Sequence, residues 1–360
     1  MKIKCFSRLF AVLMILALAA SLLVTGASAA GLPVLKGEID ARLPDLLSDL
    51  TPASGAANKL NVGGYAFGVR LFSEGVQVVG LADPASPGVL AGLERNDRIL
   101  SLDGKAVSQV DDVVRAIEES GGKPLTLEVQ RGSERLTLTL TPRQDATGKW
   151  RAGIWVRDNA AGIGTVTFVD PKTGAFGGLG HGICDADTGE LVPLTRGAVM
   201  ETEINGVVKG TEGTPGELKG YLGTKKIGSL LLNCDKGVFG VLSPVPDGLG
   251  DPVEVGGRST VHAGEAILRC TLDGKGPKDY KIELGDIRAD KSGTKCFSVH
   301  VTDPALLDKT GGIVQGMSGS PILQDGRLVG AVTHVLVGDP TRGYGIFLDN
   351  MLASLPRELT

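Results

Sequence analysis

The sequence predicts a mainly β protein with more than one domain. The chain has 360 residues, which is long for a single domain. It is rich in glycine (53) and proline (18) and poor in aromatic residues (4%), a composition typical of short strands joined by many turns. The net charge of −4 argues against a basic surface for nucleic acid, so no nucleic-acid partner is expected.

The first 30 residues have the organisation of an export signal. Lys2, Lys4 and Arg8 precede an uncharged apolar run over residues 9–24. Ala27-Ser28-Ala29 then offers small residues at the spacing that signal peptidases cleave. We expect a signal peptide or signal-anchor, and therefore an exported protein that could be anchored to a membrane. Residues 31–62 lack a sustained pattern and are interpreted as a linker.

Residues 63–142 predict a small barrel of strands with two short helices. The β-type runs are VQVVGL, DRILSL, LTLEVQ and RLTLTLT. SPGVLAGL predicts a helical turn because Ser86-Pro87 places a proline at its start. DDVVRAIEES predicts an amphipathic helix with Val113, Val114 and Ile117 on one face, and Asp103-Gly104 predicts a tight turn.

This region resembles a PDZ domain of the bacterial protease type. The resemblance rests on FGV at 67–69, on SPGVLAGLERNDRILSLDGKAV and on the DDVVRAI helix. It implies that Phe67, Gly68 and Val69 form a loop whose N–H groups bind the C-terminal carboxylate of a peptide, which adds as a β-strand. The alternative is an inert barrel that serves as a spacer.

Residues 150–357 predict a second β-type domain. Short strand patterns recur from GIWVRD and GIGTVTFVD to KCFSVHVTD, and only NMLASL near the end predicts a helix. Such a series of short strands suggests a β-barrel or a pair of barrels.

The run GMSGSP contains a candidate nucleophile. A serine hydroxyl needs an adjacent base and a site for the developing oxyanion, and glycines leave backbone N–H groups free for it. The pattern G-x-S-G-[GS]-P is that of chymotrypsin-like peptidases, which makes Ser318 the nucleophile rather than Ser320. The N–H groups of Gly316 and Ser318 would form the oxyanion hole. The alternative is a tight turn without catalytic function.

The chain has four histidines from which a base could come: His181, His262, His300 and His334. Glycines flank His181 and leave its imidazole accessible. His262 opens a strand, and His300 alternates within one and is expected on its surface. His181 is the predicted base, and His334, which closely follows the serine, is the alternative.

The acid that orients the base is less determined by the residues. Asp185 and Asp187 lie close to His181 in the sequence and are expected to form the turn after it. Asp303 lies between His181 and Ser318, which fits the His-Asp-Ser order of chymotrypsin-like peptidases.

Longer stretches resemble the stage IV sporulation protein B peptidase family of endospore-forming bacteria. They are RDNAAGIGTVTFVDPKTGAFGGLGHGICDADTG and TGGIVQGMSGSPILQDGRLVGAVTHVLVGDPTRGYGIF, preceded by the PDZ region. The resemblance implies a chymotrypsin-like double β-barrel serine endopeptidase without cofactor. It also places the catalytic triad on His181, Asp303 and Ser318.

The resemblance also implies a role. Such a protein is exported from the forespore into the space between the forespore and mother-cell membranes. There it cleaves itself and then the extracellular part of a membrane-bound inhibitor of an intramembrane protease, which permits processing of a late sigma-factor precursor. Self-cleavage is expected within residues 31–62, at an exposed stretch such as TPASGAAN, where tethering raises the effective concentration.

Two other functions stay open at this stage: a non-catalytic PDZ adaptor and a general quality-control PDZ protease. The order of domains disfavours the second, because such enzymes usually carry the PDZ domain after the protease. Cys184, Cys234, Cys270 and Cys296 lack zinc-site spacing, so no metal is expected, and their spacing assigns no disulfide.

Overall fold

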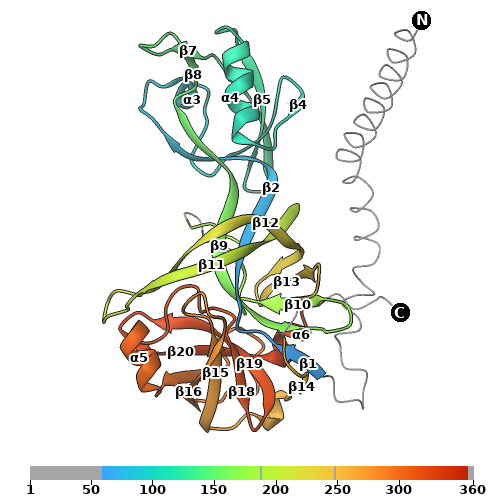
Figure 1. Cartoon of the computed structure of the whole chain (residues 1–360). Helices are drawn as coiled ribbons and strands as arrows, with labels where there is room; N and C mark the ends of the chain where they lie inside the picture. The colour runs from blue at the N-terminus through green and yellow to red at the C-terminus, as the bar shows by residue number, and fades with distance from the viewer. Residues whose placement is uncertain (1–58, 187–188, 247–248, 356–360) are drawn as a thin grey trace, which may run out of the picture. The chain divides into compact units, whose positions relative to one another are not determined.

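A computed structural model describes residues 59–186, 189–246 and 249–355 of the chain (Figure 1). The predicted signal segment and residues 31–58 of the predicted linker lie outside these residues. The described part is mainly β, as the sequence predicts, and contains one PDZ-type sheet and two β-barrels. None of its helices is long and apolar enough to cross a membrane.

The first barrel is a ring of six strands. Its order is β9, β10, β13, β12, β11 and β2, and the pairing of β2 with β9 closes the ring. The six strands are β2 (Ala66–Leu81), β9 (Ile154–Val169), β10 (Ala175–Gly178), β11 (Arg196–Val208), β12 (Glu217–Cys234) and β13 (Gly237–Leu242). β1 (Lys59–Val62) pairs with β9 and with β14 (Val253–Glu254), so the last residues of the predicted linker form a strand.

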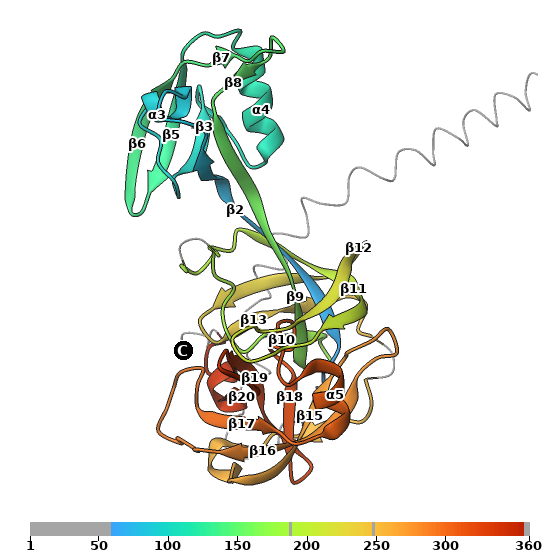
Figure 2. The ribbon, with the colours of Figure 1, turned by 90° about the vertical axis from the view of Figure 1, so that its left-hand side faces the viewer.

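The second barrel also has six strands and is closed (Figure 2). In spatial order its strands are β15 (Gly264–Cys270), β16 (Lys278–Gly285), β17 (Phe297–Val301), β20 (Asp339–Phe347), β19 (Arg327–Leu336) and β18 (Pro321–Gln324). The 3₁₀ helix η1 (Arg258–Thr260) precedes the barrel, α5 (Pro304–Thr310) follows β17, and α6 (Leu348–Leu352) is the predicted terminal helix. Asp325 and Gly326, with φ of 50° and 75°, form the hairpin turn between β18 and β19.

The PDZ region confirms both predicted helices. They are α3 (Pro87–Leu90) and α4 (Val110–Glu119). The other strands of this region are β3 (Arg98–Leu102), β4 (Lys105–Ala106), β5 (Leu125–Arg131), β6 (Glu134–Leu140), β7 (Arg143–Gln144) and β8 (Trp150–Arg151). The predicted turn has left-handed conformation at Asp103 and Gly104. A capping box at Gln109 and Asp112 satisfies N–H groups at the start of α4.

β2 and β9 run through both the PDZ sheet and the first barrel (Figure 1). The PDZ core begins at Val76, whereas Phe67, Val69 and Leu71 on the same strand belong to the core of the barrel. The predicted start of the PDZ domain at residue 63 is therefore wrong. A continuous strand gives no local signal for the change, because alternation of buried residues persists along it.

Candidate active site

The loop that carries Ser318 is held from three sides. Thr165 of β9 donates its hydroxyl to the Gly316 carbonyl at 2.9 Å and its N–H to the Ser318 carbonyl at 3.0 Å. Gly319 donates its N–H to Val332 O of β19 at 2.8 Å, and Gln315 pairs in parallel with the start of β12. The loop therefore lies between the two barrels and is fixed by strands of both.

The two glycines around Ser318 are required by geometry. Gly316 and Gly319 have φ of 95° and 91°, a region that other residues rarely adopt. A Cβ atom on Gly319 would overlap the Thr165 carbonyl and the backbone of Leu179. The nucleophile loop thus lies directly against the segment that leads to His181.

The N–H groups of Gly316 and Ser318 have no hydrogen-bond partner among the described residues. The neighbouring N–H groups are used, since Met317 donates to Val314 O and Ser320 donates to Met317 O. Two unpartnered N–H groups beside a serine hydroxyl are what an oxyanion hole requires. They are the two groups that the sequence motif indicated.

Burial distinguishes the two serines. Ser318 is partly exposed, and its hydroxyl donates to Thr333 O at 3.1 Å. Ser320 is 0% exposed, so a substrate cannot reach its hydroxyl. Of the two, only Ser318 is placed to act as a nucleophile.

His181 follows β10 in a tight backbone segment next to the serine loop. Leu179 and Gly180 have left-handed φ angles of 65° and 68°, and a Cβ on Gly180 would lie 2.8 Å from the side chain of Thr333. The His181 and His334 rings lie 5.4 Å apart, tilted by 43°. Ser318 and His181 thus both contact the dipeptide Thr333-His334, although no described hydrogen bond joins them directly.

The hydrogen bond of His181 assigns its tautomer. Its Nδ1 lies 2.9 Å from Gly182 O. A carbonyl oxygen only accepts, so the neutral ring carries its proton on Nδ1 and leaves Nε2 as the acceptor. This is the tautomer that a general base for serine needs.

His334 is poorly suited to act as the base. Burial, reinforced by the nearby His181 and Lys295, lowers the pKa of His334 to about 4. Its Nδ1 is buried without a partner among the described residues. A group with so low a pKa takes up a proton weakly near neutral pH, which favours His181 as the base.

The structure does not bring Asp303 to His181. Its carboxylate accepts from Ala305 N at 2.9 Å, Leu306 N at 3.2 Å and Lys281 N at 3.1 Å, and so caps α5. These bonds lower the pKa of Asp303 against the opposing effect of burial, the largest single influence. The role as orienting acid stays a prediction, and in this conformation Gly182 O holds the histidine.

The other candidate residues fall where the sequence predicts or outside the active site. Asp185 lies in a turn after His181, where Gly189 N donates to its carbonyl, whereas Asp187 lies outside the described residues. His300 is on the strand β17, and His262 pairs with Asp325 at 2.9 Å. The four described cysteines, Cys184, Cys234, Cys270 and Cys296, are free, and the described residues contain no cluster suited to a metal ion.

The predicted carboxylate-binding loop at Phe67, Gly68 and Val69 is wrong. These residues lie inside β2 and pair on both sides, with Gly162–Gly164 of β9 and with Val199–Met200 of β11. Phe67 is 1% exposed and packs edge-on against Phe176. Their N–H groups belong to the barrel, so they cannot receive a peptide carboxylate.

Comparison with known families decides the identity of the peptidase region. The family model described as SpoIVB peptidase S55 matches residues 148–352. The chain belongs to this family. It is therefore a serine endopeptidase, and a PDZ family model matches residues 78–131.

Curated relatives match mainly over short segments. "Probable protease eep" of Enterococcus faecalis is 28% identical over 110 residues, 29% of this chain and 26% of that protein. Regulator of sigma-E protease RseP of Salmonella typhimurium is 44% identical over 52 residues, 14% of this chain and 12% of that protein. The chain thus spans about a quarter of the first relative and less of the second.

Two solved structures are similar at low overall scores. The PDZ domain of the SdrC-like protein from Listeria monocytogenes is 20% identical, with a TM-score of 0.21, and the match covers 23% of this chain and 87% of that chain. The active form of the Rv3671c protease from M. tuberculosis is 13% identical, with a TM-score of 0.33, over 55% of this chain and 75% of that chain.

Proposed function

We propose that this serine endopeptidase is a signalling protease of sporulation. In this proposal it is exported from the forespore, cleaves itself, and then cleaves the extracellular part of a membrane-bound inhibitor of an intramembrane protease. Its family membership and its PDZ region support this role. The observation that carries the catalytic part is the partly exposed Ser318 hydroxyl beside two unpartnered N–H groups, next to His181.

The proposed chemistry begins when the Ser318 hydroxyl turns from Thr333 O toward Nε2 of His181. His181 takes the hydroxyl proton while Oγ attacks the carbonyl carbon of the substrate. The N–H groups of Gly316 and Ser318 stabilise the oxyanion that forms. His181 then donates the proton to the leaving amine, and water releases the acyl group by the same route.

The proposal keeps Asp303 as the acid that the family resemblance implies. For this role its carboxylate must leave the N–H groups of α5 and Lys281 and turn toward the histidine. The described conformation then corresponds to an enzyme whose acid is not yet engaged. Such a resting state would suit a protease that must act at one moment of a programme.

We place the peptide-binding groove of the PDZ region between α4 and the start of β9. This groove of about 200 Å³ is lined mainly by apolar residues: Val113, Val114, Ile117, Trp150, Ala152, Ile154, Trp155 and Val156. Among the described residues, no strand pairs with the outer edge of β9 at Ile154–Val156. An extended peptide can therefore add to this edge, and Gly153, with φ of 66°, begins it.

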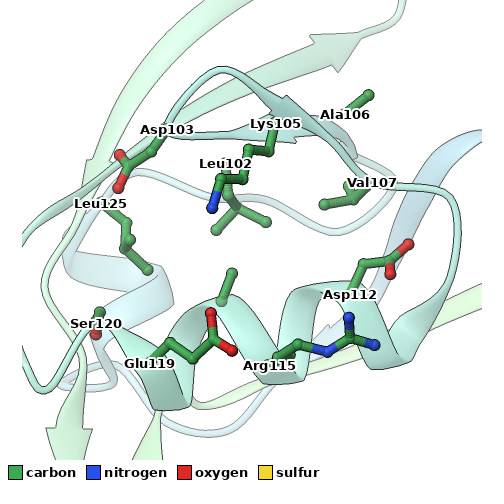
Figure 3. Close-up of a pocket in the computed structure, with 11 residues that line it drawn as sticks. Leu102, Asp103, Lys105, Ala106, Val107, Asp112, Arg115, Glu119, Ser120 and Leu125 are labelled. Carbon is green, nitrogen blue, oxygen red and sulfur yellow. The ribbon is translucent and has the colours of Figure 1, made fainter.

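A second hollow on the PDZ region has a different character. It measures about 470 Å³ and lies between β4 and α4. Lys105 extends into it from β4, and Arg115, Glu119 and Asp112 line the opposite side on α4 (Figure 3). Its charged lining, with Lys105 facing Arg115 and Glu119, makes it less suited to an extended apolar peptide.

Self-processing of the full chain tests the proposed function. The wild-type chain should shorten on a gel over time, Ser318→Ala should stay full length, and Ser320→Ala should be cut. Equal cutting of all three would mean that another protease acts on them. Casein separates the signalling role from quality control, because a signalling protease should leave it intact and a quality-control protease should degrade it.

A further inference from the structure

Arg157 and Asp158 are consecutive residues of β9 that contact different parts of the molecule. Arg157 contacts the loop after His181, and Asp158 contacts the start of α4. Arg157 donates through Nη2 to Oδ2 of Asp185 at 2.5 Å. Asp158 accepts at Oδ2 from the N–H of Val110, the first residue of α4, at 2.9 Å. Neighbouring side chains of a strand point to opposite faces, so one backbone segment holds both contacts.

The contact of Arg157 ends on the loop of the catalytic histidine. Asp185 lies four residues after His181, and its side chain is 10% exposed. An ion pair with a largely buried carboxylate fixes its partners more strongly than an exposed pair does. The segment between them is clamped by Asn233, whose amide donates to Ile183 O and accepts from Ile183 N, both at 2.9 Å. Arg157 and Asn233 therefore fix the backbone that follows His181 at two nearby positions.

The contact of Asp158 ends on the helix that lines the peptide groove. Val113, Val114 and Ile117 of α4 face the edge of β9 at Ile154–Val156, directly before Arg157. A peptide seated in this groove would lie between α4 and the segment that carries both contacts. The hydrogen bonds of Asp158 and Arg157 thus link α4, β9 and the loop after His181.

We propose that Arg157 is a positioning residue for His181, and that Arg157 and Asp158 together couple the position of α4 to catalysis at Ser318. The coupling makes the peptidase responsive to an extended, apolar peptide in the α4–β9 groove. This inference rests on the proposed function of Ser318, and it assigns no direct contact with substrate to Arg157, Asp158 or Asp185.

A tagged fluorophosphonate measures the reactivity of Ser318 without knowledge of the natural substrate. In this reaction the Oγ–P bond forms, the P–F bond breaks, fluoride leaves, and His181 takes the hydroxyl proton. The full chain is used, and the maximal rate of labelling is separated from the apparent affinity for the probe. The Ser318→Ala variant gives the background labelling, because it lacks the hydroxyl that reacts.

Arg157→Gln should lower the maximal labelling rate by between about 10- and 100-fold with little change in probe affinity, because it misplaces the base. Arg157→Lys should recover the rate to within about threefold of wild type, since it keeps a cation on the strand. The matched control is Arg269→Gln, which removes a guanidinium bonded to Asp279 at 2.6 Å within the second barrel. It should label like wild type.

A second pair of variants tests the link to α4. Asp158→Ala and Asp112→Ala each remove a carboxylate that accepts N–H bonds at the start of α4, but only Asp158 belongs to β9. Asp158→Ala should slow labelling at least about threefold more than Asp112→Ala does. Equal effects would mean that only helix stability matters and would overturn the coupling.

The failures of the two proposals are distinguishable. If wild type labels no better than Ser318→Ala, the proposed function falls, and the inference falls with it. If wild type labels at Ser318 but Arg157→Gln labels equally fast, the inference alone is overturned. A slow Arg157→Gln that Arg157→Lys does not recover also overturns the positioning role of the cation.

Discussion

The two barrels each carry one residue of the proposed catalytic pair, but they are built differently. The second barrel closes within residues 264–347 and carries the Ser318 loop before β18. The first barrel closes only with β2 and β9, which continue into the PDZ sheet, and it carries His181 after β10. The proposed nucleophile, Ser318, therefore belongs to a barrel with its own strands, and the proposed base, His181, belongs to a barrel that shares strands with the PDZ region.

This difference indicates where regulation can act. The PDZ region is joined to the first barrel by the continuous strands β2 and β9, whereas in the described part of the chain it shares no strand with the second barrel. In the proposed coupling, a peptide bound to the PDZ region therefore acts on His181 rather than on Ser318. Variants of residues in each barrel can test this difference between the first and the second barrel.

The largest effect is expected on the side of the first barrel. His181→Ala should lower the rate of self-processing by about 10⁶-fold, the cost of removing the base from a serine protease. His334→Ala should cost less than about 100-fold, because its low pKa makes it an ineffective base. Time courses of processing for both variants provide the comparison. A larger loss of processing rate for His334→Ala than for His181→Ala would mean that His334, and not His181, is the base.

Asp303→Asn tests the second barrel next. Asparagine keeps an acceptor for the N–H groups of α5, but its amide group would face the N–H of Lys281, so we expect a loss of about 1 kcal/mol of unfolding free energy. Activity should nevertheless fall by about 10⁴-fold if the carboxylate orients the base. Asp303→Ala should in addition lose about 1 kcal/mol of unfolding free energy with the cap.

Processing rates and denaturant unfolding of the two Asp303 variants separate these effects. Normal activity of Asp303→Asn would show that the carboxylate only caps α5. The orientation of His181 would then rest on Gly182 O alone.

Much of the fold and part of the site could be predicted from the sequence. Local patterns were sufficient for α4, for the turn at Asp103, and for the choice of Ser318 over Ser320. Each depends on neighbours in the chain: a periodic apolar face, a left-handed turn residue, or a glycine beside the serine.

The rest depends on distant pairing. Phe67 fits a PDZ motif locally, but Gly164 of β9 and Met200 of β11 on either side of this segment place it in the barrel. The pair of Arg157 and Asp185 joins strand β9 to the loop after His181 without any sequence signature. The capping function of Asp303 did have a signal, since an aspartate followed by proline is typical of a helix start.

Phe67→Ala tests the boundary between the PDZ region and the first barrel. As a core residue packed against Phe176, its truncation should cost about 3–5 kcal/mol of unfolding free energy. A residue in an exposed carboxylate-binding loop would cost far less. Denaturant unfolding measures the difference, with Leu90→Ala as a control because Leu90 is 64% exposed on α3. Similar costs for the two variants would contradict the placement of Phe67.

The smallest expected effect is the pH dependence caused by His334. Its folded pKa of about 4 lies below the ordinary value of 6.5, so between these values the unfolded chain binds more protons and stability falls as the pH falls. The loss should reach about 2 kcal/mol after allowance for partial exposure. His334→Phe should flatten this part of the stability curve between pH 6.5 and 4. An unchanged slope would mean that His334 does not cause it.

In the proposed mechanism, Ser318 is an activated nucleophile between the two barrels. The most direct measurement is peptide-mapping mass spectrometry of the full chain after reaction with a fluorophosphonate. The account predicts one phosphonate adduct, located on Ser318, and its loss in His181→Ala. An adduct on Ser320, or an unmodified Ser318 in a folded protein that processes itself, would contradict the account.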